Sequence, residues 1–83
     1  MTPARISATL RRALETSDFA RWGGCLAPDA LLDASLCGRH FQSTGPEQIV
    51  ADHQSMYPHP NAVVGWREIQ TTGGLVIEFE RRQ

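Results

Sequence analysis

A single carboxylate, Asp33, interrupts an apolar stretch that runs LLDASL from residue 31 to residue 36. A carboxylate held against apolar side chains has a raised pKa, because burial disfavours its charged form, and it can then exchange protons near neutral pH. His40 follows shortly after, and imidazole is the side chain whose ordinary pKa lies closest to neutrality. Asp33 as a base assisted by His40 would therefore support proton transfer.

A structural role for the same acid is the alternative. Asp33 could form an ion pair with Arg39 or Arg67, or lie in solvent at the end of a strand. The sequence leaves both interpretations open.

The thiols and imidazoles do not form a recognisable metal-binding motif. Cys37, His40, His53 and His59 fit none of the usual zinc spacings, and a lone C-x-x-H is a weak signal. The two cysteines, Cys25 and Cys37, form no C-x-x-C pair, which is typical of reduced thiols in a cytoplasmic protein. We therefore expect no metal, no cofactor and a cytoplasmic location.

Four aromatic residues, Trp22, Phe41, Tyr57 and Trp66, could line a cavity for a small hydrophobic ligand. The alternative is that they fill the core, because a domain of 83 residues needs its aromatic side chains for stability. We expect Trp22 in the core and leave Trp66 between the two roles.

Composition excludes several classes of partner. The formal net charge is −1, and the eight basic residues, all arginine, are scattered rather than gathered in a stripe, which disfavours nucleic-acid binding. No apolar run is long enough to span a membrane. The length predicts a single domain over residues 1–83.

Helical spacing and start and stop signals predict three helices. They cover residues 3–16, a second segment from a Ser17 cap to Pro28, and a third from Pro46 to the residue before Tyr57. Gly23 and Gly24 weaken the second helix, so either another element packs very close there or the helix frays.

Alternating side chains predict the strands that must position Asp33. A strand over residues 30–36 places Leu32, Ala34 and Leu36 on one face and Asp33 on the other, towards the concave side near His40 or Trp66. Cys37–Gly38 is expected to form a bend or a bulge, after which 39–42 continues as extended chain. A hairpin with arms 62–70 and 75–81 closes the chain. A four-residue loop at 71–74 places Trp66 opposite Phe79 and Arg67 opposite Glu78, whereas a two-residue Gly73–Gly74 loop keeps the same faces and shifts the partners.

Four motifs in this order resemble a known family. They are LETSDF at 14–19, LAPDA at 26–30, GPEQI at 45–49 and GLVIEFE at 74–80. Together with the order helix, helix, strand, helix, hairpin, they resemble the SnoaL-like branch of the nuclear transport factor 2-like superfamily. The resemblance spans nearly the whole chain.

The resemblance implies an α+β fold in which N-terminal helices pack on a curved antiparallel sheet around a cone-shaped pocket. The later strands that complete this cone are missing from the 83 residues, so the domain is expected to be incomplete. The edge of the last arm, 75–81, would then carry unpaired backbone groups. We accordingly expect a homo-oligomer formed through the sheet.

The same resemblance implies a small bacterial pocket protein for an apolar organic substrate, with isomerase, cyclase or hydratase-type proton transfer at Asp33 and His40. The ketosteroid-isomerase pattern also needs a tyrosine on the first helix and a second acid on a later strand, whereas the only tyrosine here is Tyr57. Whether the protein is an enzyme stays open. The alternatives are a non-catalytic ligand-binding or dimerisation module, or a truncated inactive product.

Overall fold

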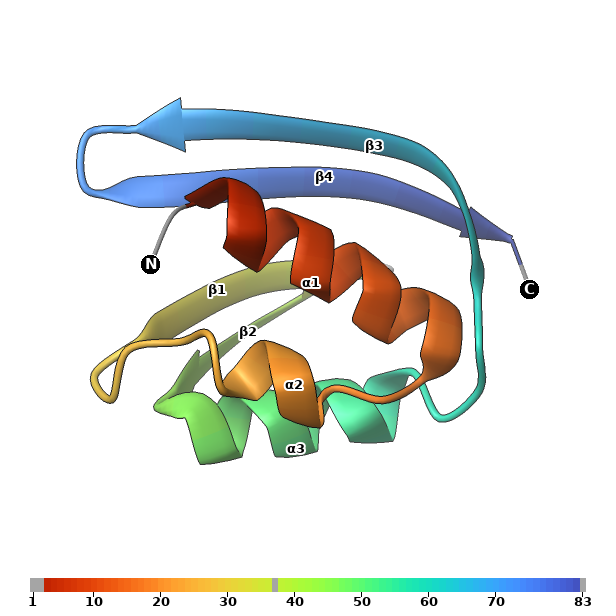
Figure 1. Ribbon diagram of the computed structural model, residues 1–83, viewed down its shortest axis with the longest axis horizontal. Coiled ribbons are helices and arrows are strands. Elements are labelled where there is room, and N and C mark those ends of the chain that lie inside the picture. Colours follow the sequence, from red (N-terminus) through yellow and green to blue (C-terminus); the bar gives the residue numbers. More distant parts are fainter. Residues whose placement is uncertain (1–2, 37, 83) are drawn as a thin grey trace.

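Helices and hairpins alternate along the part of the chain that the computed structural model describes, residues 3–36 and 38–82 (Figure 1). The elements are α1 (Pro3–Thr16), α2 (Ala20–Gly23), β1 (Leu31–Leu36), β2 (Arg39–Thr44), α3 (Pro46–Met56), β3 (Ala62–Thr71) and β4 (Gly74–Arg82). They form a compact α+β domain, so the predicted fold class is confirmed at that level.

The first helix, α1, has the bounds that its apolar spacing predicts. Leu10, Ala13 and Leu14 are buried along one face. The helix is followed by Ser17, whose φ is 59°. This left-handed conformation frequently ends a helix, but residues other than glycine adopt it at a steric cost. Two hydrogen bonds hold Ser17 in this conformation. Its hydroxyl donates to the Tyr57 carbonyl at 2.7 Å, and the side-chain amide of Gln54 donates to the Ser17 carbonyl at 2.8 Å.

The second helix, α2, is much shorter than predicted, and Ser17 does not cap it. The Asp18 carboxylate instead accepts a hydrogen bond from the Ala20 backbone N–H at 3.2 Å. Close packing, one of the two explanations for the glycine pair, is confirmed at Gly23. A Cβ added there would lie 2.4 Å from Val50 Cγ2 on α3. The glycine therefore lets the backbone of α2 rest directly on α3.

Strands β1 and β2 form an antiparallel hairpin, where the sequence predicts one strand with a bend. Leu36 pairs with Arg39, so the chain reverses between these two residues. Gly38 has a φ of 79°, which glycine adopts at little steric cost. The expected bend is therefore a full turn. Cys37 lies outside the described residues.

The third helix, α3, follows its sequence signals. Gly45 has a φ of 84°, and Pro46 occupies the first turn, where its missing N–H is not needed. The helix ends at Met56, before Pro58. It buries Ile49 and His53 on one face.

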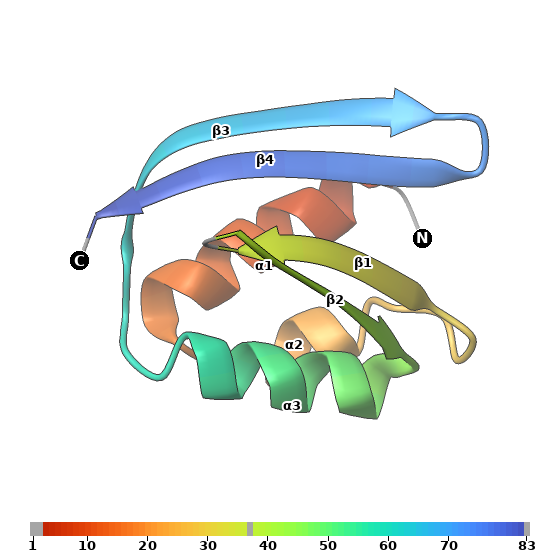
Figure 2. The same ribbon diagram turned by 180° about the vertical axis from the view of Figure 1, so that it is seen from behind.

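The long hairpin of β3 and β4 has the predicted register. Trp66 pairs with Phe79 and Arg67 with Glu78, around a two-residue turn at 72–73. The register shifts between Val63 and Gly65, which indicates a bulge at Val64. A bulge bends its strand, and the long hairpin is visibly curved where it leaves the preceding loop (Figure 2).

A single core joins the helices to the inner faces of the hairpins. Its buried members are Leu10, Ala13, Leu14, Phe19, Trp22, Ile49 and Tyr57, and Leu32, Trp66, Ile77 and Phe79 are partly buried against it. Burial falls off from the helices to the hairpins, because each hairpin exposes its other face to solvent.

Two polar contacts fasten the long hairpin to α1. The Trp66 indole N–H donates to the buried Ser7 hydroxyl at 2.9 Å. Asn61, also buried, donates from both its backbone N–H and its side-chain amide to the Leu14 carbonyl, at 3.0 and 3.1 Å. The Asn61 side-chain oxygen accepts from Arg81 on β4 at 2.9 Å. Asn61 therefore connects the end of α1 to the far strand.

The strands of the described residues form two separate antiparallel pairs, β1–β2 and β3–β4. This differs from the one curved sheet that the family resemblance implies. The long hairpin lies along α1, and the short hairpin lies near α3 (Figures 1 and 2). Consequently β1 and β4 each pair with a strand along one edge, and no strand of the described chain pairs with their other edge.

The contact between Gly23 and Val50 gives a direct test of the packing. We expect Gly23→Ala to destabilise the fold by about 1–3 kcal/mol, because overpacking outweighs the better helix propensity of alanine. Adding Val50→Ala should recover part of this loss, since it removes the clashing methyl groups. Urea unfolding monitored by circular dichroism measures both.

Gly24→Ala is the matched control, because its Cβ would make an ordinary contact, 3.4 Å from the Arg21 carbonyl oxygen. We expect little change in the free energy of unfolding for that variant. Equal effects at the two glycines would contradict the close approach of α2 to α3.

Candidate functional site

Asp33 and His40 come together on the short hairpin. Ser35 pairs directly with His40 in the β1–β2 register, so Asp33 is the diagonal neighbour of His40 on the same face. The imidazole Nε2 of His40 is hydrogen-bonded to Asp33 Oδ1. The predicted proximity of the acid to His40 is therefore present, whereas neither Arg39 nor Arg67 is its partner.

The Asp33–His40 pair is open to solvent. The Asp33 side chain is 58% exposed and that of His40 is 60% exposed. The hydrogen bond from His40, with a smaller contribution from its charge, lowers the pKa of the Asp33 carboxyl below its ordinary value. The expected desolvated acid with a raised pKa is not found. Leu32 packs against the core from one face of the short hairpin, and Asp33 lies on the opposite face. A carboxylate of this kind is a weak base.

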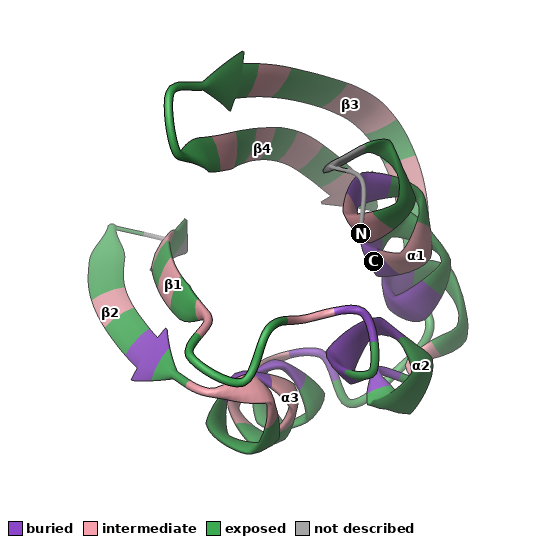
Figure 3. Cartoon of the chain, turned by 60° about the vertical axis from the view of Figure 1, so that its left-hand side comes forward, coloured by how far each residue is buried: buried purple, intermediate pink, exposed green. Residues whose placement is uncertain are grey.

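A groove of about 650 Å³ lies between the two hairpins. One wall is the inner face and edge of β1, the other is β4, and the floor comes from the helices. In Figure 3 the two hairpins lie apart, and the helices complete the ring of elements between them. The lining of the groove is mainly apolar and aromatic and includes the buried residues Leu10, Trp22, Ile49, His53 and Tyr57.

Three of the four predicted pocket aromatics line this groove, namely Trp22, Phe41 and Tyr57. Trp22 is also part of the core, as expected. Trp66 is not in the lining: its ring stacks on Phe79 with centroids 5.7 Å apart, so it supports the β4 wall from the side of β3.

His53 is the functional candidate that sequence reasoning missed. It lies on the floor of the groove and is only 7% exposed. Four aromatic rings surround its imidazole, with centroids at 4.7 Å for Trp22, 5.7 Å for Phe19, 6.0 Å for Tyr57 and 6.4 Å for Phe41. Its position four residues after Ile49, on the apolar face of α3, is the sequence signal that could have identified it.

Burial sets the protonation state of His53. Desolvation lowers its pKa below the ordinary value of 6.5, and this outweighs the opposite effects of the Ile49 carbonyl and the Asp52 charge. The ring is therefore neutral at pH 7. Its Nδ1 lies 3.0 Å from the Ile49 carbonyl, which can only accept, so Nδ1 carries the proton.

The charged groups of the groove lie around its rim. They are Asp33 on β1 and Glu78 and Arg81 on β4. The Arg81 guanidinium lies 4.9 Å from the centre of the Tyr57 ring, in a cation–π contact. A mixed rim over an apolar floor suits an uncharged or weakly polar occupant better than an ion.

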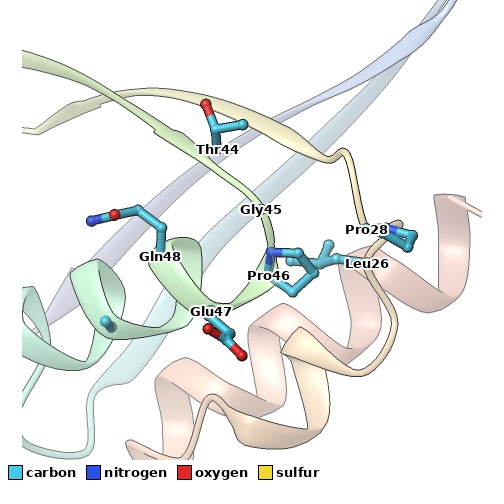
Figure 4. Close-up of a pocket in the computed structure, with 8 residues that line it drawn as sticks. Leu26, Pro28, Thr44, Gly45, Pro46, Glu47 and Gln48 are labelled. Carbon is cyan, nitrogen blue, oxygen red and sulfur yellow. The ribbon is translucent and has the colours of Figure 1, made fainter.

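A second hollow lies where the Gly45–Pro46 corner meets the loop carrying Leu26 and Pro28 (Figure 4). It encloses about 800 Å³, but none of its lining residues is buried. The hollow is therefore a surface depression, and the groove between the hairpins is the stronger candidate site.

Comparisons with protein-family models, curated proteins and solved structures found no match. The SnoaL-like resemblance thus stays a prediction. Within residues 3–36 and 38–82, no group of three or more histidine, cysteine or acidic side chains is placed to hold a metal ion. The Cys25 thiol is buried and free. None of the described helices is long and apolar enough to cross a membrane.

The lowered pKa of His53 predicts a loss of stability in mild acid. In the unfolded chain the imidazole binds a proton below about pH 6.5, whereas the folded chain resists this protonation. Stability should therefore be fully present above about pH 6.5 and fall as the pH drops towards the folded-state pKa. Urea midpoints measured from about pH 7.5 to 5 follow this loss.

His53→Phe should make the urea midpoint less dependent on pH, because it removes the titrating group and keeps an aromatic ring. The exposed His59 offers a control, and His59→Phe should leave the dependence in place. A parent protein whose midpoint is constant across this range would contradict the assignment.

Proposed function

We propose that this protein binds a small apolar organic molecule in the groove between its hairpins, as a SnoaL-like, nuclear transport factor 2-like domain. The observation that carries the proposal is the groove itself, with an aromatic floor and a volume of about 650 Å³. Pockets for small ligands are typically apolar and contain a few polar groups. The floor has one buried imidazole, and the charged residues are confined to the rim.

Binding is favoured over catalysis by the state of the predicted acid and base. Asp33 and His40 form a solvent-exposed pair, and the pKa of Asp33 is lowered. A catalytic base benefits from a pKa near the working pH and from exclusion of water, and this carboxylate has neither. Isomerase, cyclase or hydratase-type chemistry at Asp33 is therefore the weaker proposal.

A groove-filling substitution tests ligand binding. Ala34 lies on β1 opposite Phe41 and lines the groove, so Ala34→Trp should occupy the space that a ligand needs. We expect 2-methylnaphthalene at ten times its dissociation constant to stabilise the parent by about 1.4 kcal/mol, seen as a rise of several degrees in melting temperature. The folded variant should show no such rise.

Gln42→Trp is the matched control, because Gln42 is exposed on β2 and does not line the groove. That variant should respond like the parent. Asp33→Asn should also bind normally, since Asp33 lies at the rim and the proposed ligand lies on the apolar floor. If Asp33→Asn alone abolished binding, the acid would be the polar contact of the ligand. A parent that binds no apolar ring compound at all would contradict the proposal.

Self-association through the long hairpin is a second proposal, and it rests on exposed apolar side chains. Val64 is 53% and Val76 44% exposed on this hairpin, and β4 pairs only with β3 among the described strands. Burying both features against a second copy would remove apolar surface from water and pair the β4 edge.

Sedimentation velocity at micromolar concentration tests this assembly. We expect the parent to sediment as a dimer or larger species and Val76→Glu to shift it to the monomer, because the added charge opposes burial. Thr72→Glu, in the exposed turn at the tip, is the control and should leave the assembly intact. A monodisperse parent monomer would count against the proposal.

A further inference from the structure

One nitrogen on the floor of the groove is an acceptor. Because the Ile49 carbonyl accepts the Nδ1–H of His53, the neutral ring has no proton on Nε2. Nε2 therefore offers a lone pair and no hydrogen. The surrounding rings of Phe19, Trp22, Phe41 and Tyr57 hold the imidazole in place, so this acceptor has a fixed position.

The same nitrogen has no hydrogen-bond partner among the described residues. The hydrogen bond that its side chain makes within the described residues is the one at Nδ1. The indole nitrogen of Trp22 is completely covered and has no hydrogen-bond partner. The Nε2 atom of His53, by contrast, is not completely covered. An occupant of the groove can therefore reach Nε2, although only 7% of the His53 surface is exposed.

An unpaired acceptor under an apolar groove selects the chemistry of its occupant. A hydrocarbon would cover Nε2 and leave it without a partner, which weakens binding. A ligand with only ether or carbonyl oxygen would place a second lone pair against the first. An ammonium ion would supply a donor but would lose its hydration among aromatic side chains. A hydroxyl group supplies one donor and no charge.

We propose that the groove takes a hydroxyl compound with an apolar or aromatic body, a phenol or an alcohol, whose O–H donates to Nε2 of His53. This inference rests on the proposed function and adds the polar group of the ligand and the residue that recognises it. His53 is then the residue that determines specificity, and it makes no covalent contribution.

Three naphthalenes of similar shape isolate the hydroxyl group. The probes are 2-naphthol, which donates, 2-methoxynaphthalene, which only accepts, and 2-methylnaphthalene, which does neither. Dissociation constants are measured for the parent by isothermal titration calorimetry at pH 7.5. We expect 2-naphthol to bind about tenfold more tightly than the other two, the ratio that one ordinary hydrogen bond gives.

His53→Phe should bind all three naphthalenes with similar affinity, because it keeps an aromatic ring and removes the acceptor. His59→Phe, at an exposed site, should retain the parent's preference. Long-range proton–nitrogen NMR spectra of the parent provide a readout that needs no variant. The His53 Nε2 resonance should show an unprotonated nitrogen and should shift on addition of 2-naphthol but much less with 2-methylnaphthalene.

The outcomes separate this inference from the proposed function. If 2-methylnaphthalene binds and 2-naphthol shows no preference or leaves the Nε2 resonance unchanged, the inference is overturned and apolar binding stands. If no naphthalene binds, both are overturned. A preference for 2-naphthol that survives in His53→Phe assigns the hydroxyl to another partner and also overturns the inference.

Discussion

The attachment of the long hairpin to α1 is the constraint on which the rest of this structure depends. Within the described chain, no strand pairing links β3–β4 to the short hairpin. Asn61 compensates by joining the Leu14 carbonyl at the end of α1 to Arg81 on β4. Each of these groups is satisfied by the others in a buried setting, where unpaired polar atoms are costly. The position of β4, and with it one wall of the groove, follows from this contact.

The floor of the groove depends on a second close contact, between backbone and side chain. Gly23 lets α2 lie directly on Val50 of α3, which brings Trp22 next to His53. The ring cluster is therefore a product of helix packing. Its effect on chemistry is to keep an imidazole neutral and oriented in a place where water has little access.

Local signals in the sequence were sufficient for most elements of the fold. Proline and glycine indicate the start of α3, alternation indicates the faces of the long hairpin, and the length of its loop decides the register that pairs Trp66 with Phe79. The reversal between Leu36 and Arg39 was underestimated, because a single glycine indicates a bend and a hairpin turn equally well. The length of α2 was overestimated, since Pro28 marks the last position available to a helix and says little about where it ends.

The candidate site was harder to predict, because its decisive property is solvent exposure. Alternation correctly placed Asp33 opposite Leu32, but only the arrangement of the hairpins shows that its face is open. His53 was considered as a metal ligand, although its spacing from Ile49 places it on the buried face of α3. A histidine on an apolar face is ambiguous in sequence, and its neighbours in space decide its role.

The separation of the two hairpins has a consequence for the shape of the groove mouth. Strands joined by backbone hydrogen bonds must lie about 4.8 Å apart, so the width of a continuous sheet changes only in whole strands. Between β1 and β4 no such spacing applies in the described chain. The width of the mouth is set by side chains and by the helices beneath, and it can adjust continuously to the thickness of whatever lies between the two strands.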